Sequence, residues 1–228
     1  AQTAQNLGKK VGLYTSPHFF HVGERIKING RPVNDQELEY ILNWAFDRAA
    51  DEKGCGRFEI LTLAALYHFS QANVDLAVLE VGLGGRFDPV RVAPGQYSVL
   101  TSLDLEHTHI LGDSLEAIAR EKAAICKAGE TLISAVQGIA QCVPEGVFYQ
   151  EVAQPALSAQ QSNARLAAHA VQAFFNLGYL VDVAPIRLTG RLHKIQNQPD
   201  LYIDVANTPK AIESVLEHFK GRPVHAIC

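Results

Sequence analysis

Apolar residues along the chain are arranged in two ways: as short continuous runs, and as longer segments in which they recur every three or four positions. Short apolar runs bounded by turn-forming residues predict strands. Three stand out: KVGLYTS (10–16), VDLAVLEVG (74–82) and YSVLTSL (97–103). The longer segments predict helices. One spans 34–49, with Asn34 or Asp35 placed as the N-cap, and the other, 58–70, is apolar nearly all round and therefore expected to be buried.

Helices that alternate with apolar strands are typical of a parallel sheet with helices on both faces. We therefore expect an α/β fold in which 74–82 and 97–103 are adjacent parallel strands. The run 74–82 is apolar enough to be fully buried, yet it carries one carboxylate, Glu80, and then breaks into glycines followed by Arg86 and Asp88.

A further helix is predicted over the segment GDSLEAIAREKAAICKAG (112–129). Asp113 is a candidate N-cap with Glu116 at the capping-box position. Its apolar stripe includes a lysine, Lys122, and a lysine on a buried face must extend its amine to solvent, pair with a carboxylate or lose its charge. Extension or pairing with a glutamate is the structural alternative to a chemical role.

Polar side chains follow each of the three predicted strands. Ser16 ends the first, Glu80 ends the second, and His107 follows the third. Open parallel sheets bind ligands beyond the carboxyl ends of their strands, and a hydroxyl, a carboxylate and an imidazole there could hold Mg²⁺. The alternative is structural: Ser16 caps a turn, Glu80 pairs with Arg86, and His107 is an ordinary loop histidine.

Composition narrows the class of protein. The chain has 228 residues, 47% of them hydrophobic, and a net charge of -4, so it can bury a sizeable core and has no basic cluster for nucleic acid. No apolar run approaches the length of a membrane span. Its four cysteines form no CxxC pair and are too sparse for a disulfide framework, which favours a reducing, cytoplasmic location.

The chain contains no methionine and starts with AQTAQNLG, so we expect it to be a fragment. A Pro-containing stretch at 181–190 predicts a domain boundary. We expect one domain over 1–184 and the opening of a second α/β domain over 185–228, with a strand to Asp204, a helix, and a strand over PVHAIC (223–228).

Ordered motifs along the chain resemble those of the folylpolyglutamate synthase and dihydrofolate synthase family, which belongs to the ATP-dependent Mur-type amide ligases. The motifs are TSPHFF…ERIKING (15–30), FEILT (58–62), LEVGLGGRFD (79–88), TSLDLEHTHILGDS (101–114), REKAAI (120–125), QQSNARLA (160–167), LTGRLHKI (188–195) and YIDVANTP (202–209). The resemblance implies a P-loop NTPase-like central domain followed by the start of a Rossmann-like domain.

Position by position, the resemblance assigns Ser16, Glu80 and His107 to a Mg²⁺ site. It implies that Lys122 is carbamylated by CO₂, which would turn a cation into an anion able to hold a second Mg²⁺. Glu80, His107 and Lys122 are accordingly the candidate catalytic residues.

The remaining family positions bind substrates. Arg191, Asp204 and Asn163 match positions implied to bind ATP, whereas Arg86 and Asp88 lie in a loop implied to help bind the pterin. The implied partners are small molecules only: ATP, L-glutamate, and dihydropteroate or a reduced folate. The expected cofactors are two Mg²⁺ ions, with K⁺ as a further candidate ion. We expect the protein to be a monomer that binds neither a membrane nor nucleic acid.

The implied reaction forms an amide in two steps. ATP phosphorylates the carboxylate of dihydropteroate, or the terminal glutamate of a folate, and the amine of an incoming L-glutamate then attacks the acyl phosphate. Neutralising charge on a transferring phosphoryl group is the task of metal ions and arginine in such chemistry.

The chain departs from the family pattern in several places. A GTNGKGS-like phosphate loop, expected just before residue 1, is absent from the sequence, and the family's Asp-His is here Glu106-His107. PVR follows Asp88 where the family tends to have Ala-Thr-Asn, and Asn207 replaces a histidine. Breaks between motifs after Asp88, near Gln137 and near Leu180 predict that letters there are not neighbours in the full protein.

Three other classes of protein compete with this interpretation. A cell-wall Mur ligase would share the metal and lysine chemistry but should lack TSPH…ERIKING and GLGGRFD. An inactive relative that binds pterin or nucleotide is suggested by Asn207. A plain structural α/β domain would leave Lys122 unmodified and the strand ends without metal.

Overall fold

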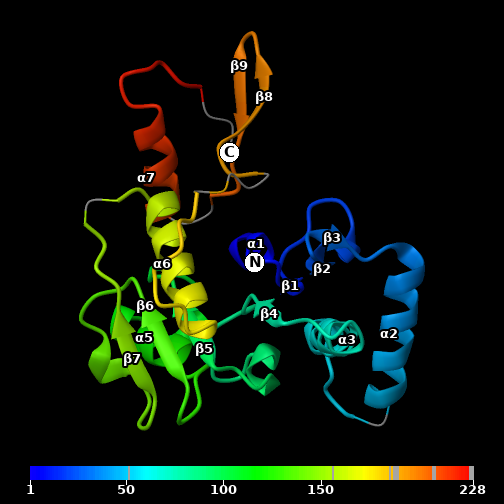
Figure 1. Cartoon of the computed structure of the whole chain (residues 1–228). Helices are drawn as coiled ribbons and strands as arrows, with labels where there is room; N and C mark the ends of the chain where they lie inside the picture. The colour runs from blue at the N-terminus through cyan, green and yellow to red at the C-terminus, as the bar shows by residue number, and fades with distance from the viewer. Residues whose placement is uncertain (51, 156, 185, 187–189, 207–208, 226–228) are drawn as a thin grey trace.

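The computed structural model describes residues 1–50, 52–155, 157–184, 186, 190–206 and 209–225, and within them the chain is a mixed α/β protein with three separate sheets (Figure 1). The α-helices are α1 Gln2–Asn6, α2 Asp35–Ala49, α3 Arg57–Gln71, α4 Thr108–Leu111, α5 Leu115–Ala123, α6 Ala159–Phe174 and α7 Pro209–His218. The strands are β1 Val11–Tyr14, β2 Ile26–Ile28, β3 Arg31–Pro32, β4 Leu76–Leu79, β5 Tyr97–Leu100, β6 Thr131–Ser134, β7 Phe148–Glu151, β8 His193–Asn197 and β9 Asp200–Ile203. Short 3₁₀ turns are η1 Val22–Arg25, η2 Pro89–Val92 and η3 Ala140–Cys142.

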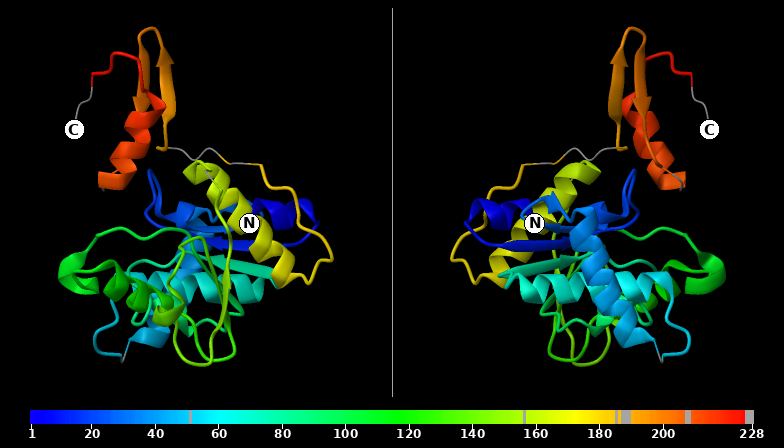
Figure 2. Two further views of the ribbon diagram at one scale, coloured as in Figure 1. Left: turned by 90° about the vertical axis from the view of Figure 1, so that its left-hand side faces the viewer. Right: turned by 90° about the vertical axis from the view of Figure 1, so that its right-hand side faces the viewer.

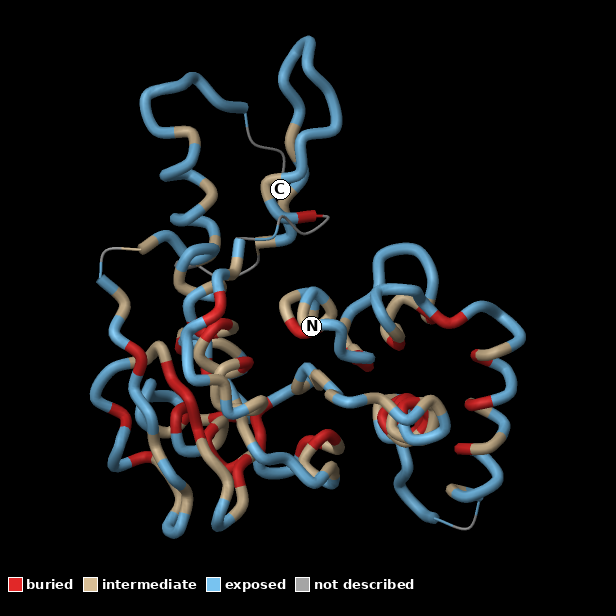
Figure 3. The backbone as a smooth tube through the Cα atoms, viewed as in Figure 1, coloured by how far each residue is buried: buried red, intermediate tan, exposed pale blue. Residues whose placement is uncertain are grey.

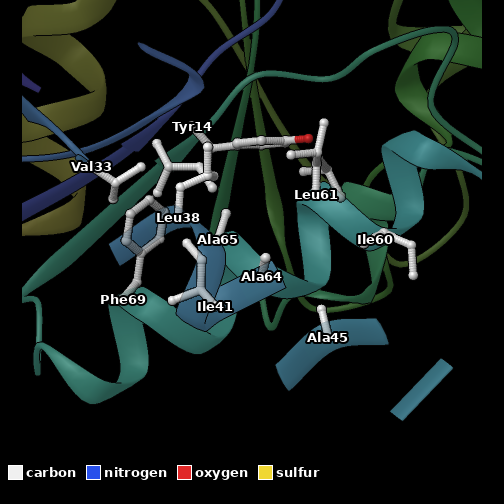
Figure 4. Packing of buried hydrophobic residues seen from close by; sticks show 12 residues of the cluster. Tyr14, Val33, Leu38, Ile41, Ala45, Ile60, Leu61, Ala64, Ala65 and Phe69 are labelled. Atoms are coloured by element: carbon white, nitrogen blue, oxygen red, sulfur yellow. The ribbon is translucent and has the colours of Figure 1, made fainter. Parts of the chain in front are cut away.

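The first sheet has the order β3-β2-β1-β4, with β1 and β4 parallel and β2 antiparallel to both β1 and β3. Helices α2 and α3 pack against it, and their buried residues share one core with Tyr14 of β1 (Figure 4). The two helices lie where the apolar periodicity predicted them. Asn34 caps α2, accepting a hydrogen bond from the Glu37 amide while the Glu37 side chain accepts one from the Asn34 amide.

The second sheet is wholly parallel, with the order β5-β6-β7. Successive residues of a strand point to opposite faces. Leu132 accordingly packs with Ile118 of α5, whereas Ile133 packs with Leu166 of α6. Helices therefore cover both faces of this sheet, as expected for an α/β fold.

The expectation that 74–82 and 97–103 are adjacent strands is wrong. Within the described residues β4 pairs with β1 and β5 pairs with β6, so the two strands belong to different sheets. The segment between β4 and β5 does not bring the chain back beside β4, because it forms η2, which packs against α3. Nor is β4 fully buried, since Ala77 is exposed and its neighbours are half-buried (Figure 3).

Helix α5 begins one residue later than predicted. Ser114 is the N-cap, and its Oγ accepts from the Ala117 amide at 3.2 Å. Glu116 does not close a capping box but forms an ion pair with Arg120, one turn along the helix, at 2.8 Å. The assignment of Asp113 as the cap is therefore wrong, because the residue after it reaches the free amide.

Strands β8 and β9 form an antiparallel hairpin that stands with α7 apart from the other two sheets (Figure 2). Tyr202 of β9 packs against the rings of His218 and Phe219. The strand predicted over 223–228 is not seen at 223–225, and its last three residues lie outside the described part. A domain division near 184 stays a prediction. In the described part of the chain no helix is long and apolar enough to cross a membrane.

Candidate active site at the strand ends

The parallel pairing of β1 and β4 brings two of the predicted site residues together. Tyr14 lies opposite Leu79 in the register, so the residues after them leave the sheet at the same edge. The Glu80 amide donates to the Tyr14 carbonyl at 2.9 Å, and the Ser16 amide donates to Glu80 Oε2 at 2.6 Å. The predicted meeting of the first two strand ends is therefore confirmed.

The Glu80 carboxylate has no cationic side chain paired with it among the described residues. The residue keeps an exposed surface, but the surrounding protein removes enough water from the carboxyl group to raise its pKa, against the opposing effects of the Ser16 amide and the more distant Arg25 charge. Among the described residues no ion pair neutralises it. Arg86, the salt-bridge partner considered above, instead pairs through Nε with Glu121 Oε2 at 3.1 Å, so that alternative is wrong.

The donors at this edge suit a hard cation that keeps part of its hydration shell. The Ser16 hydroxyl and the Glu80 carboxylate are oxygen donors, the kind that Mg²⁺ prefers. No group of three or more His, Cys, Asp or Glu side chains that could hold a metal occurs in the described part of the chain. An ion here would therefore depend on water and on substrate oxygens for much of its coordination, which is how Mg²⁺ is usually held beside phosphates.

His107, the third predicted ligand, lies at the start of α4 in a left-handed conformation with φ of 50° and is exposed. Its described neighbour is the His109 ring, 6.4 Å away between centroids. No described hydrogen bond or ion pair joins it to Ser16 or Glu80, and its metal role stays a prediction.

Lys122 pairs with a carboxylate in this structure. Its Nζ donates to Glu106 Oε1 at 3.1 Å, and the two side chains are 20% and 35% exposed. The side chain is thus largely buried, as the helical stripe predicted. The unmodified amine takes the pairing alternative, so carbamylation stays a prediction.

Asp88 fixes the shape of the loop that follows Glu80. It is 6% exposed, and its Oδ2 accepts from the amides of Gly82 at 2.8 Å and Leu83 at 3.0 Å. Its Oδ1 accepts from the Val90 amide at 2.9 Å. The carboxylate therefore holds both ends of the loop, and any contact with a pterin would come in addition to this role.

The glycines of this loop let it approach other parts of the protein. A Cβ placed on Gly85 would lie 2.5 Å from the Lys122 carbonyl oxygen and 2.7 Å from that of Glu121. Gly85 therefore brings the backbone of the loop close to α5. The loop and the helix that carries Lys122 are thereby held in contact.

Arg86 lines a cavity of about 400 Å³ together with Arg91 and Arg120, and Cys126 and Cys142 also wall it. This cavity holds neither Ser16 nor Glu80, so it is a different site, and the predicted contact of Arg86 with a pterin is untested.

The predicted ATP-binding residues fall into one pair and one separate residue. Arg191 Nη1 lies 3.5 Å from Asp204 Oδ1, and Asp204 also accepts from the amides of Leu192 at 2.7 Å and Ala206 at 2.8 Å. Asn163 lies exposed on α6. Asn207 lies outside the described residues.

Two further carboxylates with distinct surroundings were not predicted from the sequence. Glu24 accepts hydrogen bonds from the amides of Phe19, Phe20 and His21, which lower its pKa. Asp104 has an Oδ2 that is buried without a hydrogen-bond partner. Glu24 lies within the ERIKING motif and Asp104 within the motif TSLDLEHTHILGDS (101–114), so both belong to recognised patterns, but no feature of either motif singled out these two carboxylates.

Known proteins resemble this chain. A curated dihydrofolate synthase/folylpolyglutamate synthase of Bacillus subtilis (strain 168) is 30% identical over 270 residues, which cover 96% of this chain and 63% of the relative. A probable bifunctional folylpolyglutamate synthase/dihydropteroate synthase of Halobacterium salinarum is 48% identical over 128 residues, 54% of this chain and 16% of that protein. The chain belongs to the folylpolyglutamate synthase and dihydrofolate synthase family. No protein-family model matches it.

Solved structures of the family share its fold. The E. coli FolC in complex with DHPP and ADP has a TM-score of 0.84 and 29% identity, covering 98% of this chain and 62% of that one. The Yersinia pestis bifunctional folylpolyglutamate synthase/dihydrofolate synthase complexed with AMPPNP and Mn ion has a TM-score of 0.82 and 28% identity, with 95% of this chain and 60% of that one covered. The chain thus spans under two thirds of these family members.

The alignment with the B. subtilis family member also bears on chain continuity. It runs over 270 residues although this chain has 228, so at least 42 positions, the difference, lie opposite gaps in this chain. Gaps of this kind also arise between intact relatives of different length, so the expected breaks after Asp88, near Gln137 and near Leu180 stay predictions.

Gly85→Ala tests the close approach of the loop to α5. The added methyl meets backbone carbonyls that cannot swing aside, so we expect the free energy of unfolding to fall by about 1–3 kcal/mol, as for other overpacked sites. Denaturant titration gives the value. Gly178→Ala is the matched control, because a Cβ there meets nothing within 4 Å. Equal stability of the two variants would contradict the contact.

Proposed function

We propose that the protein to which this chain belongs is an ATP-dependent ligase that adds L-glutamate to dihydropteroate, to reduced folates, or to both, through an acyl phosphate. The observation that carries the proposal is the Ser16–Glu80 pair, held by a 2.6 Å hydrogen bond at adjoining parallel strand ends in a chain of this family. The names of the relatives and the DHPP, ADP and AMPPNP bound to the solved family members support the substrates.

Ser16 and Glu80 would hold the divalent cation, with His107 as a third ligand. The Mn ion of the Yersinia pestis structure supports a divalent metal, and Mg²⁺ is the ion that we propose. When bound, such an ion neutralises charge on the phosphates of ATP. A second Mg²⁺ held by carbamylated Lys122, and K⁺, belong to the same proposal.

Other residues of the chain would bind and orient the substrates. Arg191, fixed by Asp204, presents a permanent positive charge for the nucleotide, because a guanidinium stays protonated in proteins. Asp204 is itself fixed by two backbone amides, so the pair is preorganised. Asn163 is a further proposed nucleotide contact, and Arg86 with Asp88 would help bind the pterin.

The direct test is ATP hydrolysis by the full-length protein. ADP should form only when dihydropteroate or tetrahydrofolate is present together with L-glutamate and Mg²⁺, and a glutamylated product should appear in equal amount. Hydrolysis that ignores the pterin substrate would contradict the proposal. Tight binding of pterin or nucleotide without turnover would identify an inactive relative instead.

Glu80→Gln tests the metal assignment. The substitution keeps the shape and the acceptor for the Ser16 amide but removes the charge, so we expect kcat to fall by on the order of 100-fold or more. Higher Mg²⁺, or Mn²⁺, should restore part of it, because Mn²⁺ accepts nitrogen ligands more readily. Steady-state ADP release measures both effects, and Glu39→Gln, an exposed carboxylate on α2, is the control.

The stability of the same variant carries separate information. Because the pKa of Glu80 is raised in the folded state, its contribution to stability is greatest below the ordinary glutamate pKa and is lost as the pH rises through the folded pKa. Without metal, Glu80→Gln should therefore be at least as stable as wild type at neutral pH. A large loss of stability with unchanged turnover would show the metal assignment to be wrong.

Lys122→Arg tests the proposed carbamate. Arginine keeps the positive charge and can still pair with Glu106, but its guanidinium is not a nucleophile for CO₂. We expect ligase activity to be largely lost while the fold is retained, as measured by turnover and by circular dichroism. Lys127→Arg, at the end of the same segment, is the matched control. Turnover near wild type in Lys122→Arg would reject the carbamate.

A further inference from the structure

Phe19 and Gly190 lie far apart in the sequence but touch in the structure. Phe19 belongs to the loop between β1 and η1, and Gly190 opens the segment that leads into β8. A Cβ placed on Gly190 would lie 2.6 Å from Phe19 Cζ and 2.7 Å from its Cε1. Gly190 also has a φ of +74°, a conformation that favours glycine. The aromatic ring thus fills the space that a side chain at position 190 would need, and glycine is the residue that leaves this space free.

The position of Phe19 is fixed by the loop around it. The Glu24 carboxylate accepts hydrogen bonds from the amides of Phe19 at 3.0 Å, Phe20 at 3.0 Å and His21 at 2.9 Å. Phe19 is 48% exposed whereas its neighbour Phe20 is 90% exposed. The contact therefore involves one particular ring of a loop whose backbone is held in place.

Each side of the contact leads to one half of the proposed site. Ser16, which is bonded to Glu80, lies three positions before Phe19 in the same loop. On the other side, the Gly190 carbonyl accepts from the Val205 amide at 3.0 Å, next to Asp204, and Arg191 follows Gly190 directly. The contact thus links the loop that carries Ser16 to the segment that carries the Arg191–Asp204 pair.

We infer that Phe19 is a positioning residue, which sets the Arg191–Asp204 pair at the correct distance from Ser16 and Glu80 through its contact with Gly190. The inference rests on the proposed function, because positioning has meaning only if both pairs act on one nucleotide. The physical reason is that transfer reactions need reacting groups about 3–3.5 Å apart, so that a misplacement of about 1 Å can cost on the order of 100-fold in rate.

Phe19→Ala in the full-length protein tests the inference. We expect kcat to fall by about 10-fold or more and the KM for ATP to rise. The midpoint of unfolding should stay close to wild type, because a half-exposed side chain contributes little to stability. Phe19→Leu, which keeps an apolar group against Gly190, should restore most of kcat. Phe20→Ala is the matched control and should behave as wild type.

Two further measurements distinguish positioning by Phe19 from a purely structural role. Trypsin cleavage after Arg191, followed without substrates, should be faster in Phe19→Ala than in Phe20→Ala. Gly190→Ala should lower kcat because its methyl strikes the ring. In the double variant with Gly190→Ala and Phe19→Ala, the fold-loss of kcat should then be smaller than the product of the two single fold-losses.

The inference is overturned by wild-type kcat, KM and cleavage rate in Phe19→Ala. It is also overturned if the activity of Phe19→Ala falls only in proportion to its folded fraction, or if Phe20→Ala loses as much kcat as Phe19→Ala. The same holds if the losses of kcat in Gly190→Ala and Phe19→Ala simply multiply in the double variant. A wild-type protein without ligase activity would overturn the proposed function instead, and the cleavage comparison would still test the contact.

Discussion

The parallel pairing of β1 with β4 is the constraint on which the proposed site depends. It sets Tyr14 opposite Leu79, and the residues that follow each strand must then share an edge of the sheet. A one-residue change of register would turn every side chain of β4 to the other face and carry Glu80 away from Ser16. The core formed by Tyr14, α2 and α3 fixes that register, so hydrophobic packing on one side of the sheet determines the placement of charge at its end.

The loop from Glu80 to Asp88 joins this edge to α5 by backbone contacts. The Asp88 carboxylate accepts hydrogen bonds from backbone amides of the loop, and Gly85 lies against backbone carbonyls of the helix that carries Lys122. The segments that carry Glu80 and Lys122 are thereby joined by backbone contacts. The Arg191–Asp204 pair is joined to these segments differently, through the Phe19 ring and the linker.

Local patterns in the sequence predicted local structure well. The helix over 34–49, the buried helix over 58–70 and the strands at 10–16 and 74–82 all follow from periodicity and capping, which involve residues only a few positions apart. The pairing of β4 did not follow, because the choice of a strand partner depends on where intervening segments pack. Arg86 likewise pairs with Glu121, 35 positions away, rather than with the nearer Glu80. Side-chain partners of this kind depend on tertiary packing that no spacing rule contains.

The separation of β4 from β5 also leaves β4 as the end strand of the first sheet in the described part of the chain. Strand β3, at one end of the first sheet, is two residues long and carries Arg31 and Pro32, features that discourage further pairing. At the other end β4 is Leu-Ala-Val-Leu, with no charge or proline, and its outer row of backbone groups pairs with no other described strand. An unpaired apolar strand edge is a template for adding another strand. Of the two ends of this sheet, the one beside the candidate active site is therefore the less protected against the addition of another strand.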